Sequence, residues 1–206
     1  QDTTTTPQPP AQGTIALSKI SVSDESGIAQ SKTISFQIEQ NLQPGETLNV
    51  TVQKQGGAKL NAAATQSGNS TNYSVEVSEN GTYEVTATIS KDNVVLDTKK
   101  ESISVAGIDN EKPVITVTKN EDGAVEFTVK DMNATTATFD GSAVTLKTDA
   151  TSQGLVYTGT VASAAAGEHT ITATDAAGNT ATQQVTVTEK QQAPTVTVPS
   201  NTVSSA

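Results

Sequence analysis

Apolar and polar residues alternate along most of this 206-residue chain. In Tyr83-Glu84-Val85-Thr86-Ala87 and in Val125-Glu126-Phe127-Thr128-Val129, the apolar side chains fall on one parity and the polar side chains on the other. A period of two is typical of a β-strand that has one face in a core. The alternation predicts strands over residues 34–38, 48–52, 73–77, 83–87, 114–117, 125–129, 156–161, 169–173 and 185–187.

Turn-forming residues separate these segments, at 43–45, 79–81, 120–123 and 140–141. Short strands at this spacing are typical of antiparallel sandwiches. The best helical segment, residues 59–64, is short and flanked by glycines, which favours a loop or a single turn. The sequence therefore predicts an all-β fold in which alternating strands face each other in two sheets.

An internal repeat indicates two modules. The segment that begins at Gly81, GTYEVTATISKDN, aligns without gaps with the segment that begins at Gly167, GEHTITATDAAGN. Each is followed by one more alternating strand and then by a strand led by proline, at Pro113 and Pro194, a spacing suited to one immunoglobulin-sized sandwich. We predict a Thr/Pro-rich spacer at 1–13, a first sandwich at 14–107, a second sandwich at 108–190, and a linker or the start of a truncated third module at 191–206.

Composition narrows the function classes. The formal net charge is −10 and all twelve cations are lysines, so the chain lacks the basic surface that nucleic-acid binding needs. The absence of cysteine excludes disulfides and thiolate chemistry. The sequence also has no apolar run of about 18–20 residues that could span a bilayer.

The second module carries a family resemblance. Its Thr174-Asp175-Ala176-Ala177-Gly178-Asn179 phrase, followed by a short strand and a proline-led restart, resembles the last hairpin of bacterial immunoglobulin-like domains of the Big/Bap type. Residues 109–113 resemble the link between domains in that family, and the first module shares Gly81 and Thr86-Ala87-Thr88. The resemblance implies two tandem immunoglobulin-like sandwiches on a secreted or cell-wall-attached bacterial protein, without implying a particular ligand.

Oxygen-bearing side chains near this phrase form a candidate calcium site. Asp175 and Asn179 lie in one turn, and Asp109, Asn110 and Glu111 lie in the predicted link. Carboxylate and amide oxygens are the ligands that calcium prefers. The alternative is that Asp175 caps its own turn by accepting hydrogen bonds from backbone amides. The sequence predicts no other cofactor.

Nothing in the sequence predicts catalysis. His169 is the only histidine, and its equivalence to Tyr83 in the repeat indicates a packing role and not a triad. The chain has no tryptophan, and most of its six other aromatic residues fall on core parity, which disfavours a sugar-stacking platform. A lysine–asparagine isopeptide bond from Lys19 or Lys32 is a further candidate feature of the first module.

The sequence thus favours a monomeric, non-enzymatic surface module that acts as a stalk or adhesin and binds a host or bacterial surface protein or a glycan. The alternative is an accessory module, carbohydrate-binding or spacer, of a secreted polysaccharide-degrading enzyme. A third hypothesis is that an exposed strand edge binds immunoglobulins or other host glycoproteins.

Overall fold

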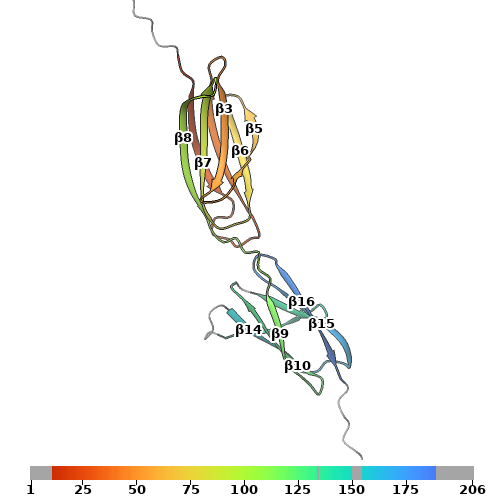
Figure 1. Ribbon diagram of the computed structural model, residues 1–206. Helices are drawn as coiled ribbons and strands as arrows, with labels where there is room; N and C mark the ends of the chain where they lie inside the picture. Colours follow the sequence, from red (N-terminus) through yellow and green to blue (C-terminus); the bar gives the residue numbers. More distant parts are fainter. Residues whose placement is uncertain (1–10, 134, 150–154, 189–206) are drawn as a thin grey trace, which may run out of the picture. The chain divides into compact units, whose positions relative to one another are not determined.

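Figure 1 shows the computed structural model, which describes residues 11–133, 135–149 and 155–188. The regular structure of these residues consists of sixteen strands, so the predicted all-β class is confirmed. Among the described residues there is no helix that could cross a membrane. The chain divides into two compact units, residues 1–111 and 112–206, which are described separately below. Residues 1–10 of the predicted spacer and the predicted linker or third module at 191–206 lie outside the described residues.

Unit 1 is a sandwich of two four-stranded antiparallel sheets. One sheet has the order β1-β2-β6-β5 and the other has the order β4-β3-β7-β8. The strands are β1 (Thr14–Val22), β2 (Lys32–Asn41), β3 (Thr47–Lys54), β4 (Lys59–Leu60), β5 (Ala63–Ser67), β6 (Ser70–Val77), β7 (Gly81–Lys91) and β8 (Val94–Val105).

The core of unit 1 follows from residue parity. Along β2 every second residue from Lys32 to Ile38 is buried, and along β7 the same holds from Tyr83 to Ile89. The two sheets therefore hide their apolar sides against each other, which is the main favourable term for such a fold. Phe36 stacks on Tyr73 with ring centroids 5.2 Å apart, and Ile108 adds to this core after the last strand.

Unit 2 repeats the topology of unit 1. Its sheets have the orders β13-β14-β10-β9 and β12-β11-β15-β16, so each strand corresponds to the strand eight numbers earlier in unit 1. The strands are β9 (Val114–Glu121), β10 (Ala124–Asp131), β11 (Thr136–Phe139), β12 (Ser142–Val144), β13 (Leu146–Asp149), β14 (Leu155–Val161), β15 (Gly167–Thr174) and β16 (Thr180–Val187). The two segments that align in the sequence form equivalent strands, β7 and β15.

The core of unit 2 is separate and smaller. Phe127 is fully buried at its centre, together with Val125, Val129 and Ile171. Gly159 on β14 lies directly opposite Phe127 in the register of β10 and β14. The missing side chain at Gly159 leaves the space that the phenyl ring fills.

All nine strands predicted by alternation fall within observed strands. The prediction of a loop or turn was wrong for residues 59–60, which form β4, and for residues 63–64, which begin β5. The segments β1 and β11 to β13 were not predicted, because β1 loses its alternation at a bulge between Ser18 and Ser21 and the other three strands are short.

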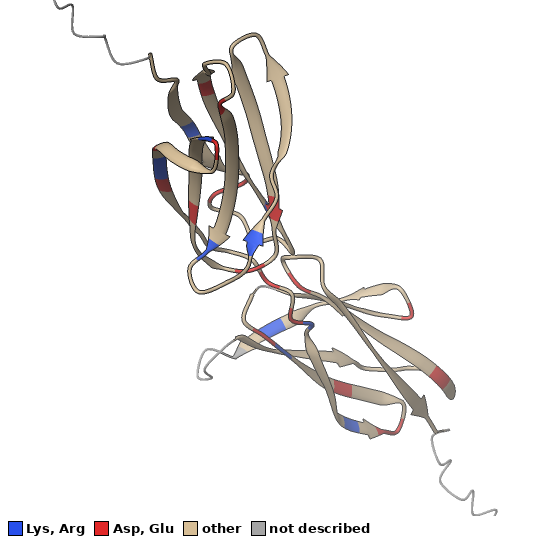
Figure 2. Cartoon of the chain, turned by 45° about the horizontal axis from the view of Figure 1, so that its top comes forward, with Lys and Arg blue, Asp and Glu red and all other residues tan. Residues whose placement is uncertain are grey.

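Threonines line the outward face of one sheet of unit 2. On β11, β15 and β16 the cross-strand partners form two threonine rows, Thr136–Thr174–Thr180 and Thr138–Thr172–Thr182. Figure 2 shows the charged positions dispersed over both units. The outer faces therefore present many neutral hydrogen-bonding groups between scattered charges.

Candidate functional site

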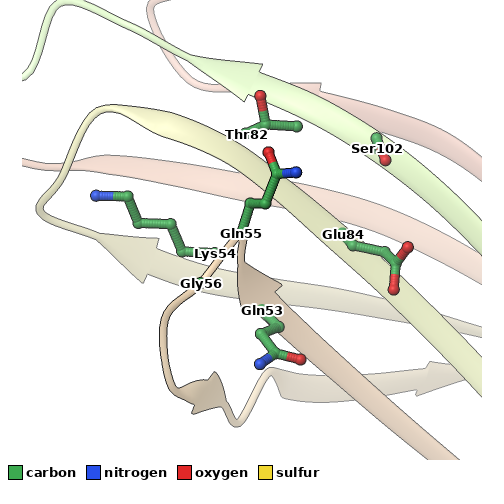
Figure 3. Close-up of a pocket in the computed structure, with 7 residues that line it drawn as sticks. All are labelled: Gln53, Lys54, Gln55, Gly56, Thr82, Glu84 and Ser102. Atoms are coloured by element: carbon green, nitrogen blue, oxygen red, sulfur yellow. The ribbon is translucent and has the colours of Figure 1, made fainter.

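A polar groove lies in unit 1 where β3 ends and turns toward β4. It has a volume of about 280 Å³. Its lining, drawn in Figure 3, comprises Gln53, Lys54, Gln55, Gly56, Thr82, Glu84 and Ser102. None of these seven side chains is aromatic, so the groove offers hydrogen bonds without a stacking platform.

Strand register brings the central groove residues together. Gln53 on β3 pairs with Glu84 on β7, and Glu84 pairs in turn with Ser102 on β8. All three residues have the outward parity of their strands, so an amide, a carboxylate and a hydroxyl form one row across the sheet. Figure 3 shows Lys54 directed away from Glu84.

Glu84 is the charged centre of this groove. Its Oε1 accepts a hydrogen bond from Lys100 Nζ at 2.8 Å, and this bond holds the pKa of the carboxyl below its usual value. Thr86 Oγ1 donates to the same oxygen at 3.3 Å. Because Lys100 balances the charge of Glu84, the groove suits a neutral ligand rich in hydroxyl groups better than an ion.

Lys54 and Glu79 form an ion pair beside the groove. Their Nζ and Oε2 atoms are 2.6 Å apart, which raises the pKa of Lys54 and lowers that of Glu79. The backbone carbonyl of Glu79 also accepts the hydroxyl of Tyr83 at 2.8 Å, and burial raises the pKa of this phenol. This bond from an early residue of β7 to a carbonyl four residues upstream matches the tyrosine corner of immunoglobulin-like sandwiches.

Two of the predicted calcium ligands, Asp175 and Asn179, lie in contact in unit 2. Asp175 Oδ1 accepts the backbone N–H groups of Ala177 and Asn179 at 2.9 and 2.8 Å, and its Oδ2 accepts the side-chain amide of Asn179 at 2.8 Å. Asp175 thus caps its turn, as the alternative interpretation expected. These bonds fix the carboxylate of Asp175. Calcium binding by this carboxylate stays a prediction.

Asp131 is an acidic neighbour of Asp175 that the sequence did not single out. Both side chains are buried, and one carboxylate oxygen of each lies within 4.8 Å of the other. Asp131 Oδ1 accepts the backbone N–H of Asn133 at 2.7 Å. Two buried carboxylates at this separation repel each other, and a bound cation would relieve that repulsion.

The other predicted calcium ligands lie at the end of unit 1. Asp109 Oδ1 accepts the backbone N–H of Glu111 at 3.0 Å, and the backbone N–H of Asp109 donates to Ala29 O at 2.9 Å. Asn110 Nδ2 donates to Ser78 O at 3.0 Å. These contacts attach the segment 109–111 to unit 1.

Lys32 has a structural role that the sequence did not reveal. Its side chain is 2% exposed, and its Nζ donates to the carbonyls of Asp24, Gly27 and Glu25 at 2.7, 2.8 and 3.3 Å. The ammonium group has three N–H donors and finds three acceptors. These hydrogen bonds account for its burial without the isopeptide bond considered from the sequence.

His169 packs in unit 2 as expected, with its ring stacked on Phe139 at a centroid distance of 4.8 Å. It also makes polar contacts that parity could not predict. Its Nδ1 lies 2.6 Å from Asp140 Oδ2 and its Nε2 lies 2.8 Å from Ala165 O. The Asp140 hydrogen bond raises the pKa of His169, and the same bond lowers that of Asp140.

No family model matches the sequence, and no curated protein matches it. A solved structure, the adhesin InvE of Yersinia pseudotuberculosis, is similar over 82% of this chain, with 16% sequence identity and a TM-score of 0.33. The match covers 58% of the InvE chain. The bacterial immunoglobulin-like family therefore remains a resemblance carried by the residues around Asp175.

Proposed function

We propose that this chain is a non-enzymatic module of a secreted or cell-wall-attached bacterial protein, where it acts as a stalk or adhesin. The observation that carries the proposal is the recurrence of one eight-stranded sandwich topology in two units that have separate cores. Units with their own cores fold and bear load individually, which suits a chain that projects a binding surface from a cell.

The surfaces of both units support this proposal. Their hydroxyl-rich faces and the net charge of −10 keep such a module soluble and disfavour self-association, as expected for a monomer. The exposed edge strand β5 pairs only with β6 and has all five residues exposed. Such an edge suits an extended segment of a host or bacterial protein, which would add as a further strand.

Single-molecule pulling on the full chain tests the stalk role. We expect two unfolding events, each lengthening the chain by roughly 30 nm, because about 95 residues extend by at most about 3.5 Å each. A single event, or extension without a force peak, would contradict independent load-bearing units.

The groove of unit 1 favours a second candidate function, an accessory carbohydrate-binding module of a polysaccharide-degrading enzyme. Its row of Gln53, Glu84 and Ser102 offers donors and acceptors suited to sugar hydroxyls. A glycan array tests this function. Asn49→Ala, on the outward parity of the same strand, is the control. Micromolar glycan binding that is lost in Gln53→Ala but kept in Asn49→Ala would favour the carbohydrate-binding function over the stalk function.

A further inference from the structure

His169 occupies the position in unit 2 that Tyr83 occupies in unit 1. Each is the third residue of its strand, β15 and β7 respectively. Tyr83 Oη donates to the carbonyl four residues upstream, Glu79 O, and His169 Nε2 contacts the carbonyl four residues upstream, Ala165 O, both at 2.8 Å. An imidazole thus replaces a phenol in the same corner of the sandwich.

The second nitrogen of His169 faces a carboxylate that is itself held in place. Asp140 Oδ2 lies 2.6 Å from Nδ1, and Asp140 Oδ1 accepts the backbone N–H of Thr170 at 2.8 Å. The backbone N–H of Asp140 also donates to Thr170 O at 2.9 Å. These two bonds to β15 hold Asp140 in place, and Phe139 stacks on the imidazole ring itself.

The two contacts of His169 indicate how many protons its ring carries. A carbonyl oxygen and a carboxylate oxygen can only accept, so both contacts are hydrogen bonds only when each ring nitrogen carries a proton. A neutral imidazole has one N–H and can make only one of them. We propose that His169 is a pH-sensitive clasp, which as an imidazolium ties the 162–166 loop to Asp140 and releases one of the two bonds when it loses a proton as the pH rises.

The bond to Ala165 is the one expected to break. Asp140 is fixed by Thr170, so the neutral ring keeps its remaining proton on Nδ1 and turns an unprotonated Nε2 toward the carbonyl of Ala165. The loop is then held by the bond from Ala164 N to Gly123 O, which is 2.7 Å long. Rising pH therefore loosens the corner without removing every contact of the loop.

The charged groups around the ring favour the clasped state. Asp140, which immediately follows β11, is the charge that acts directly on His169. Strand β16 places the uncharged Val185 opposite it, and the 162–166 loop contains only alanine and serine. Gly123, which bonds to the loop, follows the acidic Glu121 at the end of β9 and Asp122 in the turn, and Glu168 lies on the other face of β15.

The direction of the effect on stability follows from linkage. The folded-state pKa of His169 is raised above its ordinary 6.5, so its contribution is fully present below pH 6.5 and is lost as the pH rises through the raised value. The folded-state pKa of Asp140 is lowered below 3.8, so its contribution is present above pH 3.8 and is lost as the pH falls through the lowered value. Unit 2 is therefore most strongly clasped between about pH 4 and 6.5.

NMR on the full chain tests the clasp directly, because His169 is the only histidine. At pH 5.5 we expect ¹⁵N shifts of a ring protonated at both nitrogens, and a titration midpoint above 6.5 that falls in Asp140→Asn. A midpoint at or below 6.5 in the unchanged chain, or a ring with a single proton at pH 5.5, would overturn the proposal.

Unfolding measurements provide the second test, with unit 1 as an internal control because its corner uses Tyr83. Amide NMR in a denaturant series follows the two units separately. Between pH 5.5 and 8.5 we expect the midpoint of unit 2 to move to lower denaturant concentration relative to that of unit 1. The variant His169→Tyr, which copies the corner of unit 1, is expected to lose this movement, and its persistence in that variant would refute the clasp.

Discussion

Replacing Gly159 by alanine should destabilise unit 2 through a single steric conflict. A Cβ at this position would lie 2.4 Å from Cζ of Phe127 and 2.8 and 2.9 Å from its two Cε atoms. Ordinary contact begins near 3.4 Å, so the methyl group overlaps the edge of the ring by about 1 Å. Phe127 is fully buried among the core residues of unit 2 and cannot move toward solvent.

The expected cost follows from two opposing terms. Overpacking a well-filled core costs about 1–3 kcal/mol, and contact with three ring atoms places this case in the upper half of that range. Alanine also has less conformational entropy than glycine in the unfolded chain, which offsets about 0.5–1 kcal/mol of this cost. The net loss for unit 2 is therefore about 1–2.5 kcal/mol, which corresponds to a fall in Tm of roughly 4–20 °C for a domain of this size.

Urea denaturation followed by amide NMR checks this prediction for each unit separately. The matched background is Phe127→Leu, which removes the ring that the methyl group would strike. In the Phe127→Leu background, alanine at position 159 should cost less than about 0.5 kcal/mol, so a double-mutant cycle should give a coupling of at least about 0.5 kcal/mol. An equal cost in both backgrounds, or a change in unit 1, would refute the steric explanation.

Three further predictions concern polar groups. Lys32→Met should destabilise unit 1 by about 2–4 kcal/mol in urea denaturation, because three backbone carbonyls lose their donor. Its control, Lys59→Met at an exposed position, should change the free energy of unfolding of unit 1 by less than about 0.5 kcal/mol. Tyr83→Phe should cost unit 1 about 0.5–1.5 kcal/mol in the same assay, because it removes only the hydroxyl bond to Glu79 O. Calcium should raise the Tm of unit 2 by relieving repulsion between Asp131 and Asp175, and a Tm that is identical in calcium and in chelator would remove the calcium prediction.

The sequence predicted the long core strands because their information is local. In β10 the alternation from Val125 to Val129 marks the buried face without reference to any partner strand. The strands β11 to β13 contain three or four residues each, and pairing determines that they are strands: β11 pairs with β15, β12 with β11, and β13 with β14. In β1 the local pattern fails although the segment is a strand, because Lys19 has a φ of 53° and interrupts the alternation.

The polar sites depend on register, which alternation does not specify. The groove row exists because Glu84 pairs with Gln53 on one side and with Ser102 on the other. Asp140 reaches His169 because the β11–β15 pairing places Phe139 opposite Ile171. Only the cap formed by Asp175 was accessible from the sequence, because its partners lie within four residues.

The alignment of Tyr83 with His169 shows what a repeat can and cannot predict. It placed both residues at one position of the sandwich, and each makes a bond to a carbonyl four residues upstream. It could not distinguish the two donors, whose protonation differs. Burial raises the pKa of the Tyr83 phenol, so this hydroxyl donates at every pH at which the protein is expected to act. The imidazole makes both of its bonds only as a cation, so two units of one topology acquire different responses to pH from a single substitution.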